Sequence, residues 1–190
     1  HSTPIGDGGQ IQTSSHRAIK NGFKMKDAFQ IVKSFKKTEK NKPVILMGYY
    51  NMIFQYGENK FLNDCKKSGV SGIICVDLPW PENKIFAKKC KKKSIVFVQL
   101  LAPTTTKERM KKIIRDSDSM NYLISILGTT GKFGAKIGLG KDWAYNAIKA
   151  VGNYGEIWEK HLGKDSRLKM ARGKNVLHTQ GGLLISPPFR

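Results

Sequence analysis

Four apolar runs recur through the first two-thirds of the chain at nearly even intervals. They begin near residues 44, 72, 95 and 121, so successive starts are 28, 23 and 26 residues apart. Each run is continuous and does not alternate with polar residues, which is typical of a strand buried on both faces of a parallel sheet. The rhythm therefore predicts an α/β protein made of successive strand–helix units.

Two architectures fit this rhythm, a doubly wound sheet and a (β/α)₈ barrel. A complete barrel takes about 250 residues, whereas this chain has 190, so it would supply only part of one. Helical spacing of apolar residues and capping signals predict the helices between the strands. The expected features are a cap at Ser14 or Ser15 with a break at Asn21-Gly22, a helix from Met25 to about Lys37, a short helix ending at Gly69, a Lys-rich helix marked by Ile85, Phe86, Ala87 and Cys90, and a capping box at Thr105–Glu108.

The first strand ends in a group of polar and aromatic residues. Val44 to Met47 is unbroken apolar sequence, and Gly48-Tyr49-Tyr50-Asn51 follows it. We expect the strand to cover about 44–51. An α/β protein binds its ligand where such strands end, so Tyr49 and Asn51 are candidates for a binding site. A tyrosine pair packed at the rim of a core strand explains the pattern equally well.

The net charge of +20 comes mainly from lysine. A charge of this size suits a nucleic-acid-binding protein, which needs clustered Lys and Arg for phosphate contacts. Arginine, which reads bases, is scarce, and no aromatic residues for base stacking alternate with the lysines. A solvated helix face is the favoured interpretation, and a basic nucleic-acid-binding module is an alternative.

The cysteines and the apolar segments indicate a cytoplasmic protein. No apolar run approaches the ~18 residues of a membrane span, and the N-terminus has no signal-peptide pattern. Cys65, Cys75 and Cys90 are odd in number and lack metal-ligand spacing, so they are expected to be reduced and packed. We expect no metal and no cofactor.

The sequence changes character after residue 131. Residues 132–140 are Gly-rich and are predicted to be a linker. Residues 141–190 form a predicted tail that is mainly helical, opening at Asp142, although the prolines at 187 and 188 exclude a helix at the very end. The expected organisation is thus a domain at 1–131, a linker and an appended tail.

Residues 4–131 resemble the α subunit of tryptophan synthase, a (β/α)₈ barrel. The resemblance implies a partial TIM barrel of about five of the eight βα units. It also implies a lyase that cleaves indole-3-glycerol phosphate to indole and glyceraldehyde 3-phosphate and works with a β subunit. The segments that carry the resemblance are Asp7-Gly8, Ile11–Ala18, Pro43–Gly57, Val76–Pro79, Ala102–Thr104 and Thr130-Gly131.

The resemblance assigns roles to six residues. Asp7 matches the catalytic aspartate, whose carboxylate suits the indole N–H and the positive charge that develops there. Tyr122 matches a tyrosine near the catalytic acids. The implied substrate-binding residues are Met47, Tyr49 and Leu100 at the indole pocket and Thr130 on a closing loop. Met47 and Leu100 fit an ordinary barrel core equally well, as do Ile74 and Val76.

Departures from the pattern lead us to expect an inactive chain. Thr3 stands where the family usually has an Asp that meets the β subunit, the strand with the catalytic Glu would precede residue 1, and we find no match for the phosphate-binding units after residue 131.

Residues 141–190 instead resemble the end of periplasmic polar amino-acid-binding proteins of ABC transporters. The chain is therefore interpreted as a chimera, with an amino-acid-binding or transport-related protein as the alternative function. The carrying residues in this tail are Asp142–Tyr145, Ile148–Glu156, Arg172-Gly173, Gly181-Gly182 and Pro187–Arg190.

Overall fold

The structure is a computed structural model that describes residues 8–102, 104–118, 120–124, 176–179 and 182–185. The chain divides into two compact units, His1–Val98 and Gln99–Arg190, with strand β3 running through the boundary.

The first unit is built on a parallel sheet. Strand β2 (Gly72–Cys75) pairs with β1 (Ile45–Gly48) on one side and with the first half of β3 (Val96–Leu101) on the other, both in parallel. All four residues of β2 are buried, as expected for a central strand covered on both faces. The parallel strand–helix pattern predicted from the spacing is confirmed.

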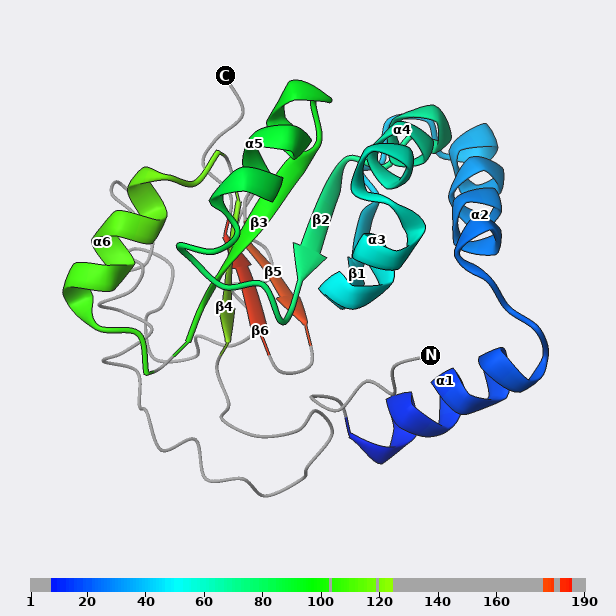
Figure 1. Ribbon diagram of the computed structural model, residues 1–190, viewed down its shortest axis with the longest axis horizontal. Helices are drawn as coiled ribbons and strands as arrows, with labels where there is room; N and C mark the ends of the chain where they lie inside the picture. Colours follow the sequence, from blue (N-terminus) through cyan, green and yellow to red (C-terminus); the bar gives the residue numbers. More distant parts are fainter. Residues whose placement is uncertain (1–7, 103, 119, 125–175, 180–181, 186–190) are drawn as a thin grey trace. The chain divides into compact units, whose positions relative to one another are not determined.

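Helices follow each strand and pack together in the first unit. Helix α4 contacts α2, α3 and α5, and Figure 1 shows α2, α3 and α4 grouped beside β1 and β2. Helix α4 ends at Gly69, whose φ of +90° favours glycine because it has no Cβ. The five helices are α1 (Gly9–Lys20), α2 (Met25–Thr38), α3 (Tyr50–Tyr56), α4 (Glu58–Ser68) and α5 (Lys84–Lys92).

The core of the first unit lies between these helices and one face of the sheet. Aromatic rings connect its layers: the Phe86 and Phe97 centroids are 5.9 Å apart, and those of Phe29 and Phe61 are 5.8 Å apart. Alternate residues of a strand point to opposite faces, so Ile73 and Phe97 belong to this core, whereas Ile74 faces the other side. Ile74 is nevertheless buried.

The second unit continues from β3 with α6 (Lys107–Arg115) and β4 (Asn121–Ile124). Gln99 to Leu101 pair in parallel with Asn121 to Leu123. Helix α6 begins after Thr106, whose side-chain oxygen accepts a hydrogen bond from the Arg109 N–H at 3.3 Å. The predicted capping box began one residue earlier, at Thr105. That side chain instead accepts a hydrogen bond from the Ala102 N–H at 3.0 Å.

The tail contains two strands that the sequence reading did not predict. Strand β6 (Gly182–Ile185) pairs antiparallel with β4, and β5 (Val176–Thr179) pairs antiparallel with β6. The prediction of a mainly helical tail is therefore wrong for these eight positions. The linker at 132–140 and the helix expected from Asp142 lie outside the described residues.

Two further predictions are corrected in the first unit. Helix α1 begins at Gly9, so Ser14 and Ser15 lie inside it and do not cap it, although it ends at Asn21 as expected. The strand expected over 44–51 ends at Gly48, where α3 starts two residues later. The Lys-rich helix expected around Ile85 to Cys90 is α5, in which Phe86 and Cys90 are buried and Ile85 is exposed.

Candidate functional site

The carboxyl ends of β1 and β2 lie side by side in the first unit. Gly48 and Cys75 are register partners, and the Val76 N–H donates to the Gly48 carbonyl at 3.1 Å. The chain then leaves β1 through Tyr49, which is extended (φ −103°, ψ 145°) and directly precedes α3. We call residues 48–51 the β1–α3 turn. It occupies the end of the sheet where parallel α/β proteins bind ligands.

A carboxylate from the segment after β2 supports the start of α3. The Tyr50 N–H donates to Asp77 Oδ1 at 2.7 Å, whereas the Tyr49 side chain makes no capping hydrogen bond. The first N–H groups of a helix have no partner within the helix, and a negative charge there also interacts favourably with the helix dipole. Asp77 therefore acts as a helix cap from a distant part of the chain, and the Cys75 thiol lies 3.6 Å from the same oxygen.

The side chain of Tyr50 is bound at its other end by Glu58. Its O–H donates to Glu58 Oε1 at 2.6 Å, and Lys89 on α5 forms an ion pair with Glu58 Oε2. Burial acts to raise the pKa of Glu58, but the hydrogen bonds from Lys89 and Tyr50 together outweigh it and lower that pKa. The Glu58 side chain is only 17% exposed, so this ion pair is shielded from water more than a surface pair is.

The hydrogen bond to Glu58 gives Tyr50 an unusual titration. Together with burial it raises the pKa of Tyr50 from its ordinary 10.0 to about 12. A raised pKa means that the neutral phenol stabilises the fold fully below pH 10 and that this contribution is lost as the pH rises from 10 to 12.

We expect Tyr50→Phe to cost about 1–2 kcal/mol of unfolding free energy at pH 8. At pH 12 the difference from the unmodified chain should nearly vanish. Urea unfolding of both proteins at each pH measures this, and an equal difference at both would contradict it.

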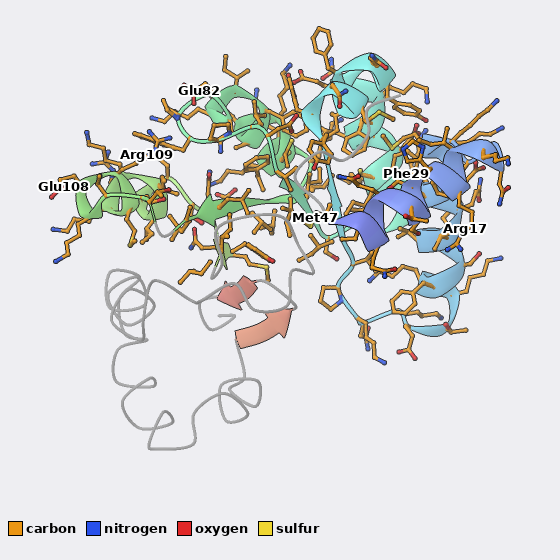
Figure 2. All side chains as sticks on the ribbon, turned by 90° about the horizontal axis from the view of Figure 1, so that it is seen from below. Arg17, Phe29, Met47, Glu82, Glu108 and Arg109 are labelled. Atoms are coloured by element: carbon orange, nitrogen blue, oxygen red, sulfur yellow. The ribbon has the colours of Figure 1, made fainter. Side chains whose placement is uncertain are left out.

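The structure describes four of the six predicted site residues. Met47 and Tyr49 lie at the end of β1 in the first unit, and Met47, labelled in Figure 2, is 56% exposed. Leu100 and Tyr122 are register partners on β3 and β4 in the second unit, and both are half-buried. Asp7 and Thr130 lie outside the described residues.

Sequence reasoning missed the residues that surround Tyr50. Glu58 is eight positions further on, in a different helix, and Asp77 is 27 positions away. The available signal was a carboxylate two residues after a buried strand, which reads equally well as a loop residue. Glu58 carried no such signal, because an acidic residue in the first turn of a helix is common.

The structure also bears on metals, thiols and membranes within the described ranges. Those residues contain no group of three or more metal-ligating side chains, and no helix among them is long and apolar enough to span a bilayer. Cys65, Cys75 and Cys90 are free and buried, as predicted. Burial raises the pKa of each thiol to about 12, so they are poor nucleophiles at neutral pH.

Parallel strands joined by helices place this chain in the α/β class, and the match to solved structures indicates a partial TIM-barrel-like fold over about 80% of the chain. The comparisons also define the family. A sequence model of the family described as "Tryptophan synthase alpha chain" matches residues 1–142. The chain therefore belongs to the tryptophan synthase alpha chain family.

Individual relatives agree with this assignment. The chain is 70% identical over 131 residues to the tryptophan synthase alpha chain of Pelagibacter ubique (strain HTCC1062), covering 69% of this chain and 49% of that protein. A solved structure of the tryptophan synthase a2b2 complex from Pyrococcus furiosus has a TM-score of 0.67 at 42% identity, covering 80% of this chain and 59% of that one. The chain thus spans about half the length of the first relatives.

The comparisons do not support the chimera interpretation. The tryptophan synthase alpha chain of Petrotoga mobilis aligns with 184 residues, 97% of this chain and 69% of that protein, at 35% identity. This alignment extends well past residue 131, where we expected no resemblance to the family. Nothing in the comparisons supports a relationship of residues 141–190 to periplasmic amino-acid-binding proteins.

Proposed function

We propose that this chain carries part of an alpha-chain lyase site and binds an indole-type ligand, but does not by itself cleave indole-3-glycerol phosphate. In this proposal Met47, Tyr49 and Leu100 contribute to the indole pocket. By resemblance to the family, Asp7 is assigned as the catalytic carboxylate, Tyr122 as the match to a tyrosine near the catalytic acids, and Thr130 as the match to a threonine of a closing loop.

The observation that carries the proposal is the end of strand β1. The exposed Met47 side chain and the extended Tyr49 flank Gly48 where the strand gives way to α3, and Asp77 caps that helix. Ligand pockets are mainly apolar and aromatic with a few placed polar groups. A methionine and a tyrosine at this position supply apolar surface suited to an indole ring.

Titration calorimetry with indole, beside a panel of amino acids, tests this proposal. We expect indole to bind and the amino acids not to bind. Tyr49→Ala should weaken indole binding by about tenfold, because an aromatic contact contributes roughly 0.5–1.5 kcal/mol beyond its buried area. Ile31→Ala is the matched control, since Ile31 is 61% exposed on α2. No binding of indole, or an equal loss in both variants, would refute the proposal.

A β subunit is the expected protein partner. The Pyrococcus furiosus structure is described as an a2b2 complex. We propose that this chain binds a β subunit weakly, because Thr3 replaces the family's Asp at the expected contact. In a pull-down, the chain should retain far less β subunit than a full-length alpha chain does, and Thr3→Asp should increase the retained amount. Equal retention by the unmodified chain and the full-length protein would contradict this expectation.

A further inference from the structure

We propose that Tyr50 is a positioning residue for the β1–α3 turn: Asp77 fixes its backbone N–H, Glu58 fixes its hydroxyl, and the two together set the position of Tyr49. The inference rests on the proposed function only for the claim that Tyr49 contacts an indole ring. The hydrogen bonds that define it, at 2.7 Å and 2.6 Å, belong entirely to the first unit.

The two contacts constrain Tyr50 from opposite ends. The backbone hydrogen bond ties residue 50 to the segment after β2, and the hydroxyl ties it to the first turn of α4. The aromatic ring between them packs edge-on against Phe86, with centroids 5.8 Å apart. A residue whose backbone N–H and side-chain hydroxyl are both hydrogen-bonded, and whose ring is packed, has little freedom to move. Because Tyr49 is covalently joined to Tyr50, the position of the Tyr49 backbone is restricted as well.

The ion pair with Lys89 keeps Glu58 ionised and in place. An ionised carboxylate is a stronger hydrogen-bond acceptor than a neutral one. The low pKa of Glu58 maintains that state at neutral pH. The β1–α3 turn is thus connected to β2 through Asp77, to α4 through Glu58 and to α5 through Lys89. Rigid elements that support a site from several sides are what precise positioning requires.

The chain contains a matched control for this arrangement. Tyr56 also donates its hydroxyl to a carboxylate eight residues later, Asp64 Oδ2, at 2.8 Å. A lysine, Lys60, pairs with that carboxylate at 2.9 Å. The chemistry and the spacing are the same, but Tyr56 lies at the far end of α3 from the turn. A role that is merely structural would make the two tyrosines equivalent.

The first test compares Tyr50→Phe with Tyr56→Phe. Each change removes one hydroxyl and keeps the ring, so both variants should fold, which thermal unfolding checks. We expect Tyr50→Phe to weaken indole binding about three- to tenfold and Tyr56→Phe to leave it within about twofold, because only the Tyr50 hydroxyl supports the residue next to Tyr49. Equal effects of the two changes on indole binding would overturn the inference.

The second test measures the turn without any ligand. Amide hydrogen exchange at residue 50, followed by NMR, reports on the bond to Asp77. Asp77→Ala should accelerate this exchange about tenfold, and Asp77→Asn should restore most of the protection, because its amide oxygen still accepts the hydrogen bond. Unchanged exchange in Asp77→Ala would overturn the inference. If the unmodified chain binds no indole, the proposed function fails, and this exchange result alone decides the role of Tyr50.

Discussion

The 190-residue chain, assayed alone, should release no detectable indole from indole-3-glycerol phosphate. Cleavage needs one group that protonates the indole ring and another that removes a proton from the glycerol hydroxyl. The resemblance to the family supplies a match for one of these acids, Asp7, and none for the catalytic Glu. A single positioned acid or base contributes roughly 10²–10⁴-fold to a rate, so lack of the second group by itself should lower turnover by a factor of that size.

Substrate orientation should reduce the rate further. We expect that residues 132–190, although the alignment with the Petrotoga mobilis alpha chain extends into them, do not supply the glycine loops that hold the substrate phosphate in the family. Binding energy from a remote group such as phosphate is what aligns the reacting carbon with the catalytic groups. Without it, an indole pocket at Met47 and Tyr49 would bind the ring but would not orient the glycerol chain for cleavage.

A coupled assay with a full-length alpha chain as the positive control measures this. The Pyrococcus furiosus alpha subunit is a suitable reference, because its structure matches 80% of the length of this chain. Turnover by the 190-residue chain that disappears on Asp7→Asn would contradict the prediction. That result would mean that other residues, including those after 131, supply the second acid and the phosphate site.

We expect the purified chain to self-associate at tens of micromolar through strand β1. In a parallel strand, successive residues direct their backbone groups to alternate sides. The carbonyls of Val44 and Gly48 accept hydrogen bonds from the β2 side, so Ile45 and Met47 direct theirs to the opposite edge. Among the described residues of the first unit, no strand pairs with that edge. An unpaired edge with an exposed apolar side chain is a template for pairing with another chain.

Light scattering of two lysine variants tests the role of this edge. Met47→Lys places a charge on β1, where charged side chains oppose edge-to-edge pairing, and it should shift the chain toward monomer. Ile31→Lys adds the same charge at a similarly exposed apolar position on α2 and should leave the association unchanged. A monodisperse monomer for the unmodified chain would show that the edge is covered, contrary to this prediction.

The sequence determined the repeating architecture and the family. The even spacing of the apolar runs predicted the parallel strands, because a strand buried on both faces requires continuous apolar sequence whatever its neighbours are. Local chemistry likewise marked the end of α4 at Gly69, since its positive φ favours glycine. These features depend on residues close together in the chain, so they can be predicted before any tertiary structure is known.

Tertiary structure decided where elements begin and which side chains meet. The β1–α3 boundary was misplaced because Tyr49, Tyr50 and Asn51 are compatible with a strand, and the helix starts there with the support of Asp77 from the end of β2. The hairpin of β5 and β6 was missed because its pairing partner, β4, is more than fifty residues away. The bonds to Tyr50 join residues of separate strands and helices. Such contacts depend on packing between distant segments, which no local pattern in the sequence encodes.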